Sequence, residues 1–167
     1  MKRLRKNERY LAVALVMAKC GSCLRRNYGA VIVKDDRIIS TGYTGSPRGE
    51  ENCCDIGTCY RIENQIPQGK EYESCRSCHA EANAIIFGNP TDMKDATLYL
   101  AGIDYNTSKE LVGVKPCSIC MRMIKNAGVC RVVTTDGEAY NRITEANKML
   151  NENFYNSEEN LQYEFFK

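Results

Sequence analysis

The spacing of the cysteines constrains this chain more than any other feature of its sequence. Six of its ten cysteines form three pairs with two residues between the partners. The pairs are Cys20 and Cys23, Cys75 and Cys78, and Cys117 and Cys120. A secreted protein would join its cysteines in disulfides, whereas an intracellular protein more often uses such pairs to bind a metal ion. The repeated spacing favours metal, so we expect the fold to gather cysteines around an ion.

The only histidine, His79, follows one of these pairs directly, and Glu81 lies two residues further on. Zinc takes about four ligands, and a catalytic zinc site takes three of them from the protein and keeps one position for water. His79, Cys117 and Cys120 supply three such ligands. The two cysteines lie i and i+3 in a predicted helix, so their thiols face the same way. They fall in its first turn, where the helix dipole favours the thiolate form that binds metal.

Glu81 is the candidate catalytic acid and base. If His79 caps the following helix, the Glu81 carboxylate lies beside a zinc-bound water, whose pKa zinc brings from 15.7 to about 7. "HAE" at 79–81 and "PCSIC" at 116–120 together match the pattern H-x-E and P-C-x-x-C of zinc deaminases that act on nucleobases. The alternative is a closed structural zinc site. Such a site would need a fourth protein ligand and would have no use for Glu81.

Hydrophobic periodicity and turn residues predict strands alternating with helices, an α/β layered fold. The predicted helices cover residues 5–23, 79–88, 116–128 and 140–150. The predicted strands cover a hairpin at 28–45 and residues 96–103, 129–135 and 161–166. A loop-rich, Cys-rich insertion at about 44–75 is long enough to need an ordering element such as a metal clip. We expect one domain over residues 1–167.

Composition excludes several classes of protein. The chain is 43% hydrophobic and 26% charged with a net charge of +2, as in ordinary soluble globular proteins. It has no tryptophan, and its basic residues cluster mainly at the N-terminus, which argues against a groove that stacks polynucleotide bases. No apolar run approaches the ~20 residues of a membrane span, and the short apolar run after the basic start lacks a signal-peptide cleavage pattern. We expect a cytoplasmic protein that binds neither nucleic acid nor membranes.

Beyond the metal motifs, the sequence resembles the zinc-dependent cytidine and deoxycytidylate deaminase family, and within it the deoxycytidylate (dCMP) deaminases of bacterial and phage type. The resemblance runs from about Tyr10 to Thr134. It rests on "CLRRNYGAVIVKDDRIISTGYTGSPRGEENCCD", "CRSCHAEANAII", "ATLYL" and "KPCSICMRMIKNAGVCRVV". The resemblance implies a cytidine-deaminase-like three-layer α/β/α sandwich around a central mixed sheet of about five strands. It also implies hydrolysis of dCMP to dUMP and ammonia in pyrimidine deoxynucleotide metabolism.

By matching positions, the resemblance implies that His79, Cys117 and Cys120 hold the catalytic zinc and that Glu81 moves the protons. It further implies substrate contacts. Asn83 matches a family residue that sits against the nucleotide.

The loop "GYTGSPRG" at 42–49 matches a family loop written GYNGxPxG, with Thr44 in place of the family's asparagine. Thr44 keeps a hydroxyl but loses the paired donor and acceptor of an amide. Arg26, Arg48 and Arg25 are candidates for contacts with a phosphate or an effector, and each is alternatively a plain surface residue.

The remaining cysteines have two interpretations. Some related deaminases carry a second, structural zinc in this region, and the resemblance implies that its ligands here would be Cys23, Cys53 or Cys54, Cys59 and Cys75. A four-cysteine site would order the insertion and position the active-site helix. Alternatively, these cysteines are free and behave as small buried hydrophobes.

The resemblance also implies a homo-oligomer such as a hexamer, activated by dCTP and inhibited by dTTP. Two other functions stay open from the residues alone. One is a non-catalytic zinc module that binds a nucleotide or a protein. The other is a deaminase of a different cytosine or purine nucleotide. Replacing Glu81 by alanine separates the first from an enzyme, because a binding module would be indifferent to that change.

Overall fold

The structure is a computed structural model that describes residues 3–146 and residue 149. Within this part of the chain, the centre is a five-stranded sheet in the order β2-β1-β3-β4-β5. The strands are β1 (Arg26–Lys34), β2 (Arg37–Tyr43), β3 (Thr97–Asp104), β4 (Arg131–Thr134) and β5 (Gly137–Asn141). β3 and β4 are parallel and every other neighbouring pair is antiparallel, so the sheet is mixed as expected.

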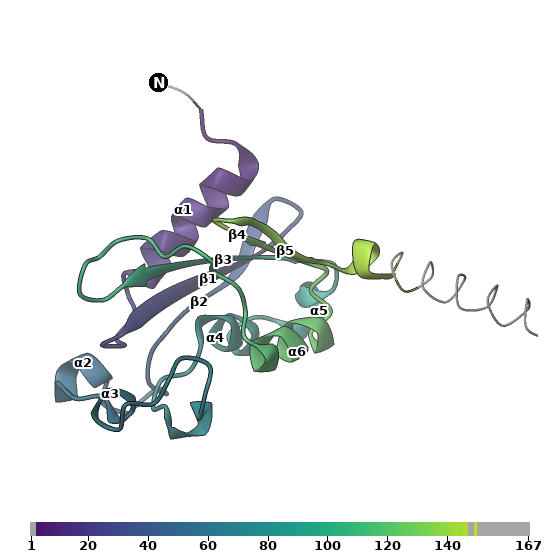
Figure 1. Cartoon of the computed structure of the whole chain (residues 1–167). Coiled ribbons are helices and arrows are strands. Elements are labelled where there is room, and N and C mark those ends of the chain that lie inside the picture. Colours follow the sequence, from purple (N-terminus) through teal and green to yellow (C-terminus); the bar gives the residue numbers. More distant parts are fainter. Residues whose placement is uncertain (1–2, 147–148, 150–167) are drawn as a thin grey trace, which may run out of the picture.

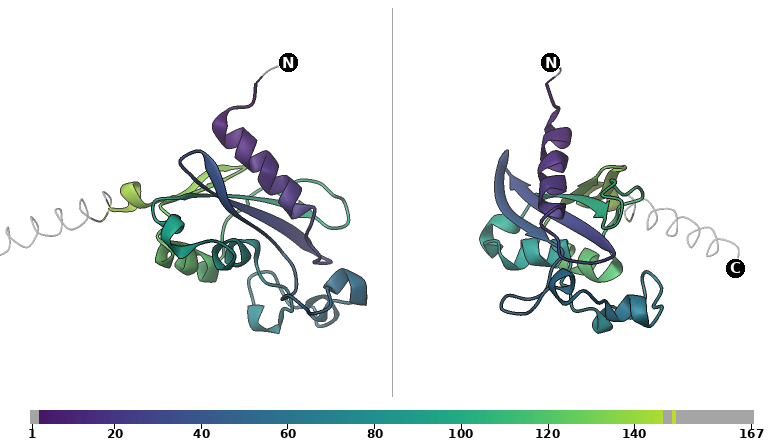
Figure 2. Two further views of the ribbon diagram at one scale, coloured as in Figure 1. Left: turned by 180° about the vertical axis from the view of Figure 1, so that it is seen from behind. Right: turned by 90° about the vertical axis from the view of Figure 1, so that its left-hand side faces the viewer.

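Helices cover both faces of this sheet. The helix α1 (Lys6–Ala18) lies on one face (Figure 1). The helices α4 (Ala80–Ile86), α5 (Pro90–Met93) and α6 (Ser118–Asn126) lie on the other. The turned views show the same separation (Figure 2). The predicted three-layer α/β/α sandwich is therefore confirmed.

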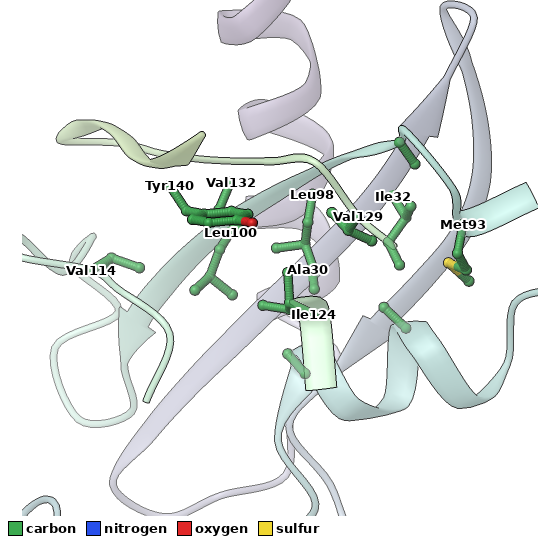
Figure 3. Packing of buried hydrophobic residues seen from close by; sticks show 13 residues of the cluster. Ala30, Ile32, Met93, Leu98, Leu100, Val114, Ile124, Val129, Val132 and Tyr140 are labelled. Atoms are coloured by element: carbon green, nitrogen blue, oxygen red, sulfur yellow. The ribbon is translucent and has the colours of Figure 1, made fainter. Parts of the chain in front are cut away.

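Alternating side chains of the sheet fill two separate cores. Val31 of β1 and Tyr99 of β3 pack towards α1. Their neighbours Ile32 and Leu98 point the other way, into a core that includes Ile124 of α6 (Figure 3). Because successive side chains of a strand point to opposite faces, a sheet covered on both sides needs nearly continuous apolar strands. The runs "AVIV" and "LYLA" meet that need.

Two glycines set how closely the helices approach the sheet. A Cβ atom on Gly29 would lie 2.0 Å from the carbonyl oxygen of Ala14 in α1. A Cβ atom on Gly42 would lie 2.3 Å from the carbonyl oxygen of Ala80 in α4. Both distances are far below ordinary contact, so only a residue without Cβ lets the backbones sit this close. Gly42 thus sets the distance between β2 and α4, and the N-cap residue of α4 is His79.

The sequence prediction is wrong at two helix boundaries. The helix expected over residues 5–23 ends at Ala18, and the second error lies near the C-terminal end. Residues 140–150 were expected to be helical, but β5 continues to Asn141 and helix starts only at residue 142. Tyr140 pairs with Val132 of β4, and its ring is buried in the larger core. The turn between β4 and β5 consists of Thr135 and Asp136, and Gly137, the first residue of β5, has a φ of +122°. The predicted strand at 161–166 lies outside the described residues.

The Cys-rich insertion contains short helical turns. They are α2 (Cys53–Ile56), α3 (Tyr60–Glu63) and the 3-10 helix η1 (Tyr72–Ser74). Figures 1 and 2 show the insertion on the same side of the sheet as α4 and α6. None of the helices in the described part of the chain combines the length and the apolar composition that a membrane span requires.

Candidate metal centre and active site

The starts of two helices carry the predicted metal ligands. His79 is the N-cap residue of α4, with an extended backbone at φ −75° and ψ 149°. Cys117 is the N-cap residue of α6, and its Sγ accepts a hydrogen bond from the backbone N–H of Cys120 at 3.4 Å. An N-cap acceptor satisfies an N–H group that the helix itself leaves without a partner. The Cys117 thiol therefore caps the N-terminus of α6 and is also a predicted metal ligand.

The three side chains meet at one point. Nδ1 of His79 lies 3.6 Å from Sγ of Cys117 and 3.4 Å from Sγ of Cys120. In tetrahedral zinc sites, with Zn–S near 2.3 Å and Zn–N near 2.0–2.1 Å, a nitrogen and a sulfur ligand lie about 3.6 Å apart. The donor set and its spacing therefore fit zinc. The structure describes no fourth His, Cys, Asp or Glu ligand atom within 4.8 Å of all three.

Glu81 lies buried beside these ligands and lines the same cavity as His79 and Cys117. Burial raises the pKa of Glu81 to about 7, against weaker opposing effects of its own backbone amide and of Cys120. A carboxyl with a pKa near neutral pH can both accept and donate a proton under ordinary conditions. Burial, followed by the charge of Arg61, lowers the pKa of His79 and so favours the neutral imidazole that binds metal.

A cavity of about 930 Å³ opens in front of this group. That volume lies within the range of about 300–1,000 Å³ typical of small-molecule sites. Its wall carries charges of both signs. The cationic residues are Arg25, Arg26, Arg61, Arg76 and Lys115. The acidic residues besides Glu81 are Glu50, Glu63, Glu73 and Asp104. The cavity can therefore take a small polar or anionic molecule next to the metal ligands.

The residues proposed to contact the nucleotide are distributed unevenly around this cavity. Thr44 lines it, but its hydroxyl accepts a hydrogen bond from the N–H of Tyr28 at 3.0 Å. Arg26 also lines it and donates to the side chain of Gln68 in the insertion.

Asn83 and Arg48 are not part of the cavity wall. Nδ2 of Asn83 donates to the carbonyl oxygen of Tyr43 at 2.8 Å. The guanidinium of Arg48 sits 4.2 Å from the centre of the Phe87 ring. Asn83 thus ties α4 to the last residue of β2, and Arg48 packs the segment after β2 against the C-cap residue of α4.

The cysteines suggested for a second zinc do not form a ligand group like that of the triad. Four of them line the cavity, and Cys54 is exposed outside it. Those four are Cys23, Cys53, Cys59 and Cys75. Burial is the main cause that raises the pKa of Cys75, and the nearby thiols of Cys23 and Cys53 add to it. In the described part of the chain, the triad alone has three ligand atoms mutually within 4.8 Å.

Two residues of the insertion that lie at the site were not predicted from the sequence. The ring of Tyr72 meets the imidazole of His79 edge to face, with ring centres 4.8 Å apart. The guanidinium of Arg61 lies 5.1 Å from the centre of the Tyr72 ring. Both residues stand in a segment without hydrophobic periodicity, so no sequence signal pointed to them.

A histidine and two cysteines held at helix starts, beside a buried carboxylate in an α/β/α sandwich, define a zinc-dependent deaminase. The chain matches the family profile "cytidine and deoxycytidylate deaminase zinc-binding region" over residues 4–136. The protein belongs to this family.

Named relatives agree with this assignment. The deoxycytidylate deaminase of Mycobacterium phage D29 is 35% identical over 132 residues, which cover 76% of this chain and 91% of that protein. The deoxycytidylate deaminase of Schizosaccharomyces pombe is 34% identical over 125 residues, which cover 74% of this chain but 35% of the yeast protein. The fold is similar to that of the dCMP deaminase of cyanophage S-TIM5 in apo form. The TM-score is 0.53 at 24% identity, and the match covers 80% of this chain and 84% of that one.

Proposed function

We propose that this protein hydrolyses dCMP to dUMP and ammonia with the help of one zinc ion. The observation that carries the proposal is the triad of His79, Cys117 and Cys120 beside the buried Glu81, with His79, Cys117 and Glu81 lining one cavity. The dCMP specificity rests on the relatives of this chain. Deoxycytidylate deaminases of the phages D29 and T4 are 35% and 31% identical to it.

The mechanism follows from the positions of the protein groups. His79, Cys117 and Cys120 would hold zinc, which when bound supplies a Lewis acid that makes water acidic enough to react near neutral pH. Glu81 takes one proton from the attacking water and passes it to N3 of the base. It then takes the proton of the hydroxyl group added at C4 and delivers it to the amino nitrogen that leaves C4. Ammonia departs, the carbonyl of dUMP replaces the C–N bond, and the Glu81 carboxylate is regenerated. Such acid and base catalysis typically contributes about 10²–10⁴-fold.

The substrate phosphate would be bound by cations of the cavity wall. Arg26 is a candidate because it lines the same cavity as His79, Cys117 and Glu81. Arg48 is a weaker candidate because its guanidinium packs on Phe87 and is not part of that wall. Thr44 supports the site indirectly, since its hydroxyl is already paired with the backbone of Tyr28.

The test is an ultraviolet assay of zinc-loaded protein with dCMP, other cytosine nucleotides and purine nucleotides, each with and without dCTP. We expect dCMP to be converted, and Glu81→Gln to keep its zinc while ammonia release falls by about 10²-fold or more. Unchanged dCMP under both conditions would reject the substrate. A protein whose nucleotide binding and turnover ignore Glu81→Gln would be a binding module instead.

The second zinc, the oligomer and the effectors are finer parts of this proposal. If Cys59 helps to hold a structural zinc, Cys59→Ser should lower both the zinc content and the melting temperature while the triad keeps its metal. An unchanged zinc-to-protein ratio in that variant would rule out the extra site. Mass measurement in solution tests the hexamer, and activity with added dCTP or dTTP tests activation and inhibition.

A further inference from the structure

Arg61 is a buried cation whose hydrogen-bond partners are backbone carbonyl groups. Its side chain is part of α3, and the residue is only 4% exposed. Nη1 donates to the carbonyl oxygen of Glu71, and Nη2 donates to that of Pro67, both at 2.9 Å. None of the ion pairs found among the described residues includes Arg61. A buried charge is costly unless it is hydrogen-bonded, so these two bonds must fix the guanidinium firmly.

The two bonds close the insertion into a loop. They tie position 61 to positions 67 and 71, and the N–H of Ile66 adds a third tie by donating to the carbonyl oxygen of Arg61 at 2.9 Å. At the far end, Glu71 adopts a left-handed backbone with φ 48° and ψ 51°, which residues other than glycine rarely adopt. The Arg61 fork binds the carbonyl of that same residue. Its planar geometry serves two acceptors at once, which a lysine ammonium matches poorly.

The residue after this turn is Tyr72, and its ring reaches the metal ligands. The Tyr72 ring and the His79 imidazole meet at 85°, with their centres 4.8 Å apart. Nδ1 of His79 faces the two sulfurs. Within the described part of the chain no hydrogen-bond partner is found for its Nε2. A metal-binding histidine usually needs a neighbour that fixes its ring orientation, and the edge-to-face contact with Tyr72 provides one.

We propose that Arg61 is a positioning residue that acts through Tyr72. Arg61 holds the loop of residues 61–71 in place, and this loop keeps the Tyr72 ring in contact with the His79 imidazole. The ring then keeps Nδ1 directed at the metal and forms the outer wall of the cavity where the base would bind. The part of this inference that concerns turnover rests on the proposed function. The part that concerns metal retention does not.

A double-mutant cycle tests the inference on the zinc-loaded full chain. The variants are Arg61→Met, Tyr72→Leu and the double variant, and Arg37→Met is the matched control because Arg37 is exposed in β2. The first readout is the rate at which zinc passes to a chromogenic chelator. Each single change should speed release by about 10-fold, the lower end of the effect of removing a supporting neighbour of a metal ligand. Arg37→Met should release zinc at the wild-type rate.

The double variant decides whether Arg61 acts through Tyr72. If it does, the double variant should release zinc no faster than Tyr72→Leu, because residues that act through one contact are not additive. Independent contributions would multiply to about 100-fold and would overturn the proposal. An Arg61→Met protein that only raises the KM for dCMP, with zinc release unchanged, would overturn it too, since Arg61 would then be a phosphate ligand.

One further variant, together with Tyr72→Leu, keeps the test decisive if Arg61→Met does not fold. Tyr72→Phe should match the wild-type release rate, because the ring rather than the hydroxyl contacts His79. Tyr72→Leu should still release zinc faster, and release at the wild-type rate would overturn the proposal. If the wild-type protein leaves dCMP unchanged, the proposed function fails, but the zinc-release cycle still tests the contact between Arg61, Tyr72 and His79.

Discussion

Adding a single methyl group at Gly42 should separate the two halves of the metal site. The Cβ of Gly42→Ala would lie 2.3 Å from the carbonyl oxygen of Ala80 and 2.4 Å from the nitrogen of Ala84, about 1 Å short of the 3.4 Å at which ordinary contact begins. Both obstacles are backbone atoms, so α4 itself must move by about that distance. Overpacking of this kind typically costs about 1–3 kcal/mol of unfolding free energy.

The displacement matters because α4 carries only part of the site. His79 and Glu81 would move with α4, while Cys117 and Cys120 stay on α6. A misplacement of about 1 Å in a catalytic arrangement can reduce turnover by about 10²-fold. We therefore expect Gly42→Ala to lower kcat for dCMP by that order and to weaken zinc retention, beyond its loss of stability.

Gly29→Ala is the matched control on the opposite face of the sheet. Its Cβ would lie 2.0 Å from the carbonyl oxygen of Ala14 and 2.4 Å from the nitrogen of Ala18, so the steric conflict is similar but displaces α1. Urea unfolding should show comparable destabilisation of both variants. At a temperature where both are folded, only Gly42→Ala should lose kcat and zinc. Equal losses in both variants, or wild-type kcat in Gly42→Ala, would refute the reasoning.

Three further changes probe single side chains. Burial raises the pKa of Glu81 to about 7 from 4.5, so the folded metal-free protein holds this proton more tightly than the unfolded chain, and that contribution to stability is lost as the pH rises from about 4.5 to 7. In urea unfolding of metal-free samples, the free energy of unfolding of Glu81→Gln should increase relative to that of the wild type across this pH range. A difference that does not change with pH would contradict the prediction. Thr44→Val leaves the Tyr28 N–H without its acceptor and should lower the free energy of unfolding by about 1–3 kcal/mol in the same assay, with Thr44→Ser close to wild type. Arg48→Met should leave the KM for dCMP near the wild-type value. A large rise in KM would instead indicate that Arg48 binds the substrate phosphate.

The metal ligands could be predicted because their chemistry leaves few alternatives. One histidine in the whole chain, two cysteines spaced i and i+3, and a glutamate two residues past the histidine form a pattern readable without the fold. The layered sandwich was predictable for a similar reason. Its strands are apolar over nearly their whole length, and its main helices end in recognisable turn residues such as Gly128 at a φ of +83°.

The walls of the cavity could not be predicted, because they depend on contacts between segments without a pattern. The resemblance places Asn83 against the nucleotide and makes Arg48 a candidate for a phosphate or effector contact. In the structure their side chains contact Tyr43 and Phe87, and the nucleotide contacts stay predictions. Tyr72 contacts His79 from an insertion whose backbone carbonyls are bonded to Arg61, and no sequence pattern predicts those contacts. The contribution of a loop residue to a site depends on where the rest of the loop is held.

The triad joins the starts of two helices that pack in the same core but approach different strands. Gly42 sets the approach of α4 to the edge strand β2, while α6 connects the parallel strands β3 and β4. An ion bound by one residue of α4's start and two of α6's start would fix the distance between the two helices. Metal binding and folding are then linked, because the geometry that binds zinc exists only when both helices are in place. Zinc retention should therefore respond to a shift of either helix before turnover is measured, which makes it the more direct probe of the site.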